Sequence, residues 1–271
     1  HTLSGKFSAY AQFVCTVIRA VFIFNHRNHF MRFLYNVPAL LHKGALIVGD
    51  LHFGIEERMH AKGIFASDIS NSLANKLLLI IKKTRAKRLF ILGDVKDNIT
   101  CVDDYTLRAF EILASSGIQI TIVRGNHDGG IERLEFLGIS ALPSEGIVYE
   151  GLALVHGHSW PSEECMQADY LISAHQHPQI EFVDKSKKRH TESAWFVAPS
   201  NFREMKKHYK TPNKNLKIIL MPAFNPLVGS PLNHGKSRAV IHLGPLLRNK
   251  IFKWEDAILY RLTGEATGKI K

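Results

Sequence analysis

Residues 45–57, ALIVGDLHFGIEE, form an apolar run that ends at two polar side chains, Asp50 and His52. A short apolar run that ends in Gly-Asp is typical of a buried parallel strand, whose last residues emerge at the carboxyl edge of a sheet. Open α/β sheets place their ligand-binding and catalytic residues at that edge. This stretch therefore predicts an α/β fold with a functional site at the end of the strand.

The same pattern returns at four further places along the chain. The four runs and the polar residues that follow them are 89–92 with Asp94 and Asp97, 120–123 with Asn126, His127 and Asp128, 152–155 with His156 and His158, and 170–173 with His175 and His177. Since each apolar run carries Asp, Asn or His to its end, we expect these side chains to converge in space. The repeated pattern predicts a metal site.

The residue types indicate which metals would bind. Imidazoles mixed with carboxylates and one amide oxygen suit Mn, Fe, Zn or Ni, whereas oxygen-only sites suit Mg or Ca and thiolates suit structural Zn. Seven candidate ligands are too many for one ion, and they match two ions that share a carboxylate: Asp50, His52, Asp94, Asn126, His156, His175 and His177. Two ions roughly 3.5–4 Å apart stabilise both the attacking and the leaving oxygen of a displacement at phosphorus. The pattern therefore predicts hydrolysis of a phosphate ester.

Five motifs, in this order along the chain, resemble the calcineurin-like metallophosphoesterase superfamily: D-x-H, GD-x-x-D, GNHD, H-G-H and AH-x-H. The flanking stretches YNVPALL and MPAFNPLVGSPLN resemble archaeal SbcD-related phosphoesterases and, more distantly, SbcD-type DNA nucleases. The resemblance runs from Met31 to the last residue. It implies a four-layer α-β-β-α sandwich that binds two divalent ions, with Mn²⁺ expected and Fe, Zn or Ni as alternatives. It also implies that a metal-activated hydroxide attacks phosphorus.

The resemblance also implies a role for each ligand. The first ion would be held by Asp50, His52, Asp94 and His177, and the second by Asp94, Asn126, His156 and His175. Asp94 would bridge the two ions.

Other residues of the motifs would act beside the ions. His127 resembles the histidine that contacts the phosphate and protonates the leaving oxygen, and Asp128 would orient it. Asp97 would accept a hydrogen bond from a metal ligand without binding the ion itself. His158 either faces the substrate or is a turn residue. Ala174 departs from the glycine that is usual in the family and adds a methyl group to a tight turn.

The rest of the chain alternates between predicted strands and helices. We expect strands at 39–41, 45–48, 89–92, 118–123, 147–149, 152–155, 181–183, 194–198, 216–221 and 257–261. Helices are expected at 69–84, capped by Ser67 or Asp68, from Asp103 or Asp104 to about Ser115, and after Gly130. Such alternation predicts parallel strands in layers. A turn at 222–226 should lie near the active face, by the same resemblance.

The first thirty residues differ from the remainder. Residues 11–24 are apolar apart from Gln12, Thr16 and Arg19, which is too short a run for a membrane span of about 20 residues and lacks a signal-peptide cleavage site. We therefore predict that residues 1–30 are an N-terminal extension outside the core fold. Residues 31–271 are predicted to form a single metallophosphoesterase domain.

A basic stretch follows the last histidine motif. Its candidate nucleic-acid contacts are Lys187, Lys188, Arg189, Arg203, Lys206 and Lys207, with Trp195, Phe196, Phe202 and Tyr209 interleaved. Cations that follow a phosphate backbone, together with rings that stack on bases, are typical of grooves for single-stranded nucleic acid. The alternative is a solvated loop whose lysines only maintain solubility.

Composition favours a polyanionic substrate. The chain has 35 Lys and Arg against 24 Asp and Glu, a formal charge of +11. This balance favours nucleic acid, with no stable membrane association. The three scattered cysteines, Cys15, Cys101 and Cys165, fit a reducing cytoplasm.

The predicted function is a phosphodiesterase or nuclease on DNA. The alternatives are a phosphodiesterase or phosphomonoesterase on a small molecule, and a non-catalytic nucleic-acid-binding component of a DNA-processing complex. By resemblance to SbcD-like proteins, a homodimer or a place in a DNA-processing complex is expected.

Overall fold

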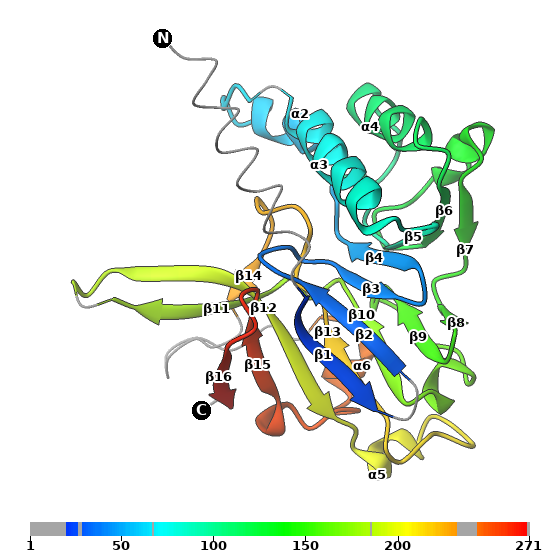
Figure 1. The fold of residues 1–271 in the computed structure, drawn as a ribbon, viewed down its shortest axis with the longest axis vertical. Coiled ribbons are helices and arrows are strands. Elements are labelled where there is room, and N and C mark those ends of the chain that lie inside the picture. Colours follow the sequence, from blue (N-terminus) through cyan, green and yellow to red (C-terminus); the bar gives the residue numbers. More distant parts are fainter. Residues whose placement is uncertain (1–19, 27–28, 67, 185, 232–242, 270–271) are drawn as a thin grey trace.

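Two β-sheets stacked face to face form the centre of the molecule (Figure 1). The computed structural model describes residues 20–26, 29–66, 68–184, 186–231 and 243–269. In the first sheet the strands lie in chain order: β1 (Ala20–His26), β2 (His29–Leu34), β3 (Leu40–His42), β4 (Ala45–Gly49), β5 (Arg88–Leu92), β6 (Gln119–Val123) and β7 (Ser140–Leu142). Strands β4 to β7 are parallel, whereas β1 to β4 pair antiparallel.

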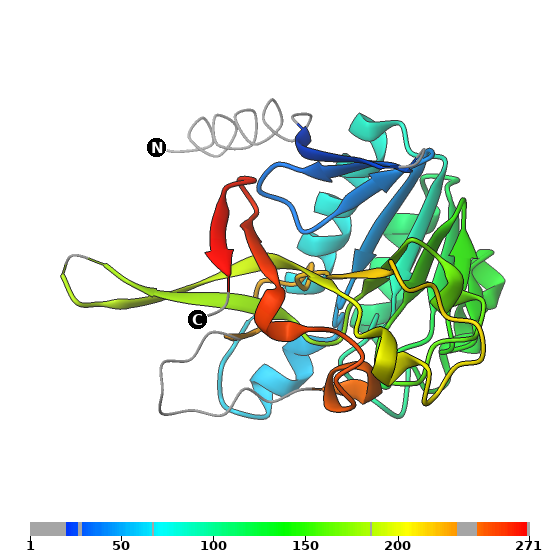
Figure 2. The same ribbon diagram turned by 90° about the horizontal axis from the view of Figure 1, so that it is seen from below.

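The second sheet is mixed, with three parallel strands at its centre. Its strands are β8 (Ile147–Tyr149), β9 (Leu152–Val155), β10 (Tyr170–Ser173), β11 (Pro178–Val183), β12 (Arg189–Pro199), β13 (Lys217–Leu220), β14 (Ser230–Pro231), β15 (Ile258–Arg261) and β16 (Ala266–Lys269). Strands β9, β10 and β13 run parallel, and β12 pairs antiparallel with β13 and β15. Strands β11 and β12 also form a long hairpin that projects from the body (Figures 1 and 2).

Helices complete the outer layers. On the first sheet these are α2 (Ile55–His60), α3 (Ile69–Thr84), α4 (Asp104–Ala114) and the 3₁₀ turns η1 (Ile131–Leu137). In the part of the chain that the structure describes, the helices on the second sheet are short: η2 (Cys165–Gln167), α5 (Phe202–Met205), α6 (Gly244–Arg248) and η3 (Trp254–Asp256). Within the described residues, no helix has both the length and the hydrophobicity to cross a membrane.

Three clusters of buried side chains fill the spaces between these layers. Leu77 of α3 and Phe110 of α4 pack on the first sheet, Phe33 and Trp195 meet between the two sheets, and Leu246 of α6 packs on the outer face of the second sheet. The predicted four-layer α-β-β-α sandwich is therefore confirmed, with an outer layer of short helices and loops on the second sheet.

Helices α3 and α4 show how the sequence specifies local structure and where it does not. Helix α4 begins as predicted, because Asp103 accepts a hydrogen bond from the backbone N–H of Thr106 at 2.8 Å. Asp68 precedes α3 with a φ of 69° and makes no side-chain cap. Instead, the buried carboxylate of Glu56 accepts from the backbone N–H and the hydroxyl of Ser70. A residue from α2 therefore caps α3, which local sequence could not reveal.

The sheet continues across the boundary predicted at Met31. Strand β1 pairs antiparallel with β2, with Ile23 opposite Arg32. Residues 1–19 of the predicted extension lie outside the described residues. The division of the chain at residue 30 stays a prediction.

Replacement of Trp195 by alanine should lower the free energy of unfolding by about 3–5 kcal/mol. The indole is fully buried between the sheets and meets the ring of Phe33 edge-on at 4.7 Å. Trp160→Ala is the matched control, since Trp160 is 37% exposed and should cost far less. Urea denaturation of both variants measures the difference, and equal losses would contradict this description of the core.

Candidate metal centre

The ends of parallel strands from both sheets bring the predicted ligands together. Asp50 and His52 follow β4, Asp94 follows β5, Asn126 follows β6, His156 follows β9, and His175 and His177 follow β10. Ligand atoms of Asp50, His52, Asp94 and His177 all lie within 4.8 Å of one another, and so do those of Asp94, His156 and His175. Asp94 belongs to both groups, as a bridging carboxylate would.

Asn126 lies beside the second group, with its side-chain oxygen 3.2 Å from Nε2 of His156. All seven predicted ligands are thus close to one another in the structure.

Five of these ligands have a left-handed backbone. The φ angles are 54° at Asp50, 44° at His52, 47° at Asp94, 68° at His175 and 45° at His177. Such a conformation costs a non-glycine residue about 1 kcal/mol or more, and it is typical of functional sites.

Hydrogen bonds between neighbouring loops hold these strained turns. The backbone N–H of Asp50 donates to the carbonyl of Gly93, and that of His52 donates to the carbonyl of Asp94. The N–H of His175, from the other sheet, lies 3.2 Å from a carboxylate oxygen of Asp50.

Glycines in the motifs allow the loops to approach closely. A Cβ at Gly125 would lie 2.3 Å from Oδ1 of Asp94, and one at Gly49 would lie 2.7 Å from the Cβ of Ala174. The methyl group of Ala174, the departure from the family pattern, is therefore accommodated because the residue opposite is glycine.

Burial and mutual charge set the protonation of the centre. Burial opposes ionisation of Asp94, but the hydrogen bond and charge of His156 hold the pKa of this carboxyl below its ordinary value. Burial also disfavours charge on His156, yet Asp94 and Asp50 raise the pKa of His156 to about 9. Burial and then the charge of His156 lower the pKa of His175 to about 3. Near neutral pH the metal-free centre thus carries a proton on His156 and a neutral His175.

Two histidines have ring nitrogens that suit metal ligation. Among the described residues, both ring nitrogens of His52 and Nε2 of His177 are buried and make no hydrogen bond of acceptable geometry, although carboxylate oxygens lie nearby. Nε2 of His52 is 3.9 Å from Oδ2 of Asp94, and Nε2 of His177 is 3.2 Å from Oδ1 of Asp50. Buried nitrogens without partners are costly. A divalent ion that prefers imidazole and carboxylate would satisfy them, so the residues fit a candidate dinuclear site.

His127 lies at the edge of the two groups. Its Nε2 is 3.9 Å from Oδ2 of Asp94, and its Nδ1 is 2.9 Å from the carbonyl oxygen of Asp97. The carboxylate of Asp128 is directed elsewhere and accepts from the backbone N–H groups of Val95 and Gly125. The contact that orients the His127 ring is thus the Asp97 carbonyl, because the Asp128 carboxylate accepts from the backbone of its own loop at Gly125 and of the loop after β5 at Val95.

Asp97 and His158 lie close to ligands. Oδ1 of Asp97 is 3.4 Å from Nδ1 of His52, and its other oxygen pairs with Arg58 at 2.9 Å. The His158 ring centroid is 5.2 Å from that of His156 and 6.0 Å from that of His175. Whether His158 faces the substrate stays a prediction.

Sequence reasoning missed three residues beside the centre. Asn225 is fully buried, and its amide donates to the carbonyl of Leu51, which fixes the loop between two ligands. Its only signal was the turn at 222–226. Arg58 and the buried Lys96 gave no signal, since arginines and lysines are ordinarily solvent-exposed.

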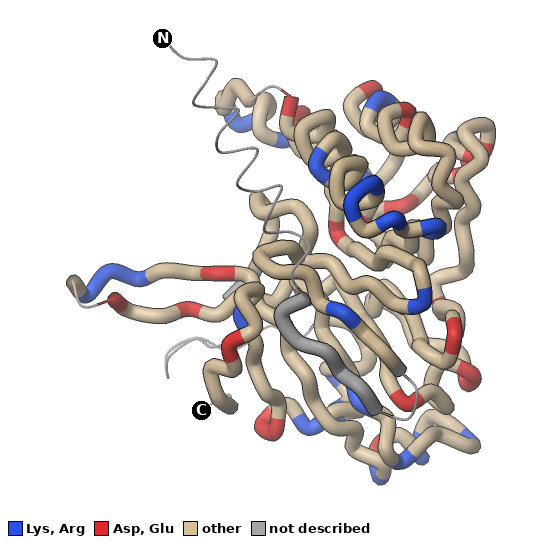
Figure 3. The backbone as a smooth tube through the Cα atoms, viewed as in Figure 1, with Lys and Arg blue, Asp and Glu red and all other residues tan. Residues whose placement is uncertain are grey.

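The candidate nucleic-acid residues separate into two places. Lys187, Lys188 and Arg189 lie at the far end of the β11–β12 hairpin, hereafter the arm (residues 178–184 and 186–193), where Figure 3 shows a group of cationic positions. Arg203, Lys206 and Lys207 follow the other end of β12.

This second group lies away from the ligands because of strand direction. Pro199 at the end of β12 is opposite Lys217 at the start of β13, which is in turn opposite the start of β10. The ligands follow the opposite ends of these parallel strands. The expectation that the whole basic stretch forms one groove is therefore not met.

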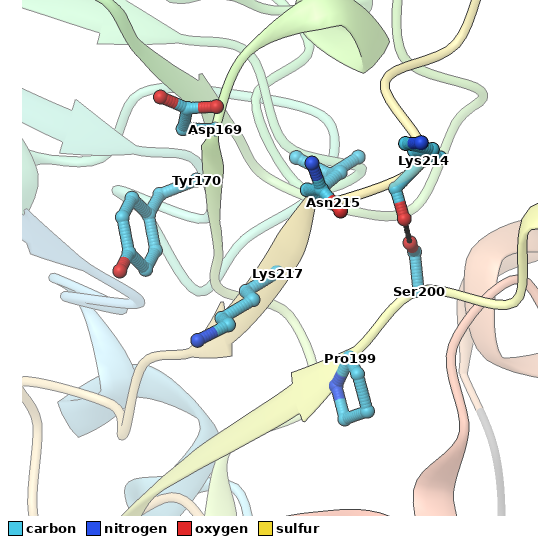
Figure 4. A pocket seen from close by; sticks show the side chains of 8 residues that line it. Asp169, Tyr170, Pro199, Ser200, Lys214, Asn215 and Lys217 are labelled. Carbon is cyan, nitrogen blue, oxygen red and sulfur yellow. Dashed lines mark hydrogen bonds between the residues drawn. The ribbon is translucent and has the colours of Figure 1, made fainter. Parts of the chain in front are cut away.

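A pocket lies at the same end of the second sheet, where β10 and β13 begin and β12 ends (Figure 4). We call this end of the sheet the far edge. The pocket has a volume of about 370 Å³, and Asp169, Ser200, Lys214 and Lys217 are among the residues that line it. No metal ligand contributes to its walls, so it is separate from the centre.

Residues 45–198 match the family described as calcineurin-like phosphoesterase. The match covers more than half of the chain and contains all seven ligands. The chain belongs to the calcineurin-like phosphoesterase family. This phosphoesterase is accordingly a metal-dependent phosphoric ester hydrolase.

A solved structure shares its fold. A crystal structure of Pseudomonas putida nuclease MPE aligns with a TM-score of 0.55 and 18% identity, over 89% of this chain and 96% of that one. Yfce, a phosphoesterase from E. coli, aligns with a TM-score of 0.34 and 20% identity over 52% of this chain and 73% of its own. A search of curated proteins found no match to the sequence.

Replacing Asp94 by asparagine should weaken both metal sites of the phosphoesterase, because only this carboxylate belongs to both groups. His175→Ala is the matched comparison, since His175 belongs to one group. With limiting Mn²⁺, metal analysis should fall from about two ions per chain to fewer than about one in the Asp94 variant and to about one in the His175 variant. Equal metal content in the two variants would contradict a shared carboxylate.

Metal binding near neutral pH should release a proton from His156, whose pKa is raised to about 9 in the metal-free protein. Metal ligands must be deprotonated, so the apparent affinity for Mn²⁺ should rise with pH up to about 9, by up to about tenfold per pH unit for one proton. Calorimetry in two buffers of different ionisation enthalpy counts the released protons. A pH-independent affinity would refute this protonation state.

Proposed function

We propose that this phosphoesterase is a phosphodiesterase that cleaves DNA, with Mn²⁺ as the preferred metal. The observation that carries the proposal is the position of the arm. Strand β11 begins at Pro178, directly after the ligand His177, and the hairpin then projects into solvent (Figure 2). A polymer bound along the arm would therefore pass the metal centre.

The chemistry of the arm suits a polyanion. Arg189 pairs with Glu181 and His190 pairs with Asp184, which leaves Lys187 and Lys188 without an acidic partner among the described residues. The ring of Phe182 is 42% exposed and stacks on His190 at 5.4 Å. Free cations beside an exposed aromatic ring favour phosphate and base contacts.

Each part of the centre has a role in this proposal. The two ions, when bound, would supply an activated water for attack on phosphorus and neutralise the developing charge. His127, a quarter exposed, would donate a proton to the leaving oxygen, a step worth about 10²-fold or more. The carbonyl of Asp97 keeps its ring in place.

Two further observations support a DNA substrate. The formal charge of +11 favours association with polyanions. The fold is shared with a protein named as a nuclease. A relation to archaeal SbcD-like proteins, a homodimer and a place in a DNA-processing complex stay predictions.

The test is hydrolysis of bis-p-nitrophenyl phosphate and of labelled single- and double-stranded DNA with Mn²⁺, using the parent protein, His127→Ala and Asp94→Asn. The parent should cleave DNA, and both variants should lose about 10²-fold or more in rate. Cleavage of the small diester alone would refute the DNA substrate and favour a small-molecule phosphodiesterase. Metal binding without any cleavage would favour a nucleic-acid-binding component.

Removing the two arm lysines together, Lys187→Ala with Lys188→Ala, should weaken DNA binding and reduce its salt dependence by about two counterions. Hydrolysis of bis-p-nitrophenyl phosphate should not change, because the tip of the arm projects from the body of the molecule (Figure 2) and contributes no candidate ligand. Lys206→Ala with Lys207→Ala is the matched control, with the same loss of charge on the far edge. Fluorescence anisotropy at several salt concentrations compares them, and equal effects would contradict a specific role for the arm.

A further inference from the structure

Lys96 is fully buried two residues after Asp94. Its ammonium nitrogen donates to three backbone carbonyl oxygens: those of Asn98, of Ile99 at 3.0 Å and of His127 at 2.6 Å. An ammonium group has three donors and no acceptor, so this environment satisfies it completely. Buried lysines are rare. Because these acceptors of Lys96 are backbone carbonyl oxygens, its ammonium group ties together the segments that carry them.

The three carbonyls belong to two separate loops. Asn98 and Ile99 lie in the loop that follows β5, and His127 lies in the loop that follows β6. Charge-assisted hydrogen bonds are about twice as strong as neutral ones. Lys96 thus fixes the distance between these loops.

That distance determines the position of the His127 ring. The backbone N–H of His127 donates to Oδ1 of Asp94 at 3.0 Å, its carbonyl accepts from Lys96, and its Nδ1 meets the carbonyl of Asp97. Asp97 directly precedes Asn98, which Lys96 also holds. One ammonium group therefore connects the segment that carries His127 to the segment that orients its imidazole.

We infer that Lys96 is a positioning residue for phosphoester hydrolysis, which acts by keeping Nε2 of His127 directed at the metal centre. Its buried side chain does not reach the substrate. The inference rests on the role proposed for His127 and not on DNA as the substrate.

A double-mutant cycle between Lys96→Met and His127→Ala tests it. The substrates are the phenyl and p-nitrophenyl esters of thymidine 5′-phosphate with saturating Mn²⁺, which differ only in the leaving group. Lys96→Met should lower kcat for the phenyl ester by about tenfold or more, since small misplacement of a catalytic group is costly. KM and metal content should stay close to those of the parent. In the His127→Ala background the same change should have almost no further effect.

The leaving group supplies a second readout. A poorer leaving group depends more on proton donation. Both single variants should therefore lose more activity on the phenyl ester than on the p-nitrophenyl ester. A merely structural role for Lys96 would reduce both rates alike.

Two controls guard against general destabilisation. Leu113→Ala creates a cavity in the buried core at the far end of α4 and should leave kcat unchanged. Lys96→Arg retains the cation with a different donor geometry, and it should recover part of the activity lost in Lys96→Met. It also replaces the methionine variant in the cycle if that variant does not fold.

Independent, multiplicative losses would overturn the inference, as would loss of metal from the Lys96 variants or an unchanged rate in His127→Ala. Failure to cleave DNA, with the aryl esters still hydrolysed, would refute the proposed substrate alone. The two failures are thus distinguishable.

Discussion

The rest of the structure depends on the contacts that the shared carboxylate of Asp94 makes with both groups of ligands. This carboxylate is buried where the two sheets meet, and it belongs both to the group with Asp50, His52 and His177 and to the group with His156 and His175. Each group thus contains a histidine from the second sheet. A buried carboxylate is stable only with close partners. Both sheets must therefore present the carboxyl ends of their parallel strands at one place, which is what the face-to-face packing achieves.

The loops around this carboxylate combine strain with support. Ligands such as Asp50 and His177 adopt a left-handed backbone that a free peptide would avoid. The surrounding loops hold it through backbone hydrogen bonds, the amide of Asn225 and the ammonium of Lys96. These contacts contribute to the preorganisation of the ligands.

Local patterns predicted the elements well. Helix α3 spans the predicted residues, Asp103 caps α4, and β8 and β9 have the predicted bounds, since hydrophobic spacing and capping operate over a few residues. The prediction was incomplete where partners are distant. Glu56 caps α3 in place of Asp68, and strand β16 near the end of the chain was missed because its Gly-containing sequence has no apolar alternation.

The sequence by itself determined the fold class and the seven residues that could ligate metals, because apolar runs that end in Asp, Asn or His need no distant information to be recognised. Tertiary structure decided what each side chain contacts. It directed Asp128 to backbone N–H groups of two neighbouring loops, placed Arg203 at the ends of the strands opposite the ligands, and buried Lys96 between two loops. The physical reason is that periodicity is local, whereas hydrogen-bond partners and strand direction depend on residues far away in the chain.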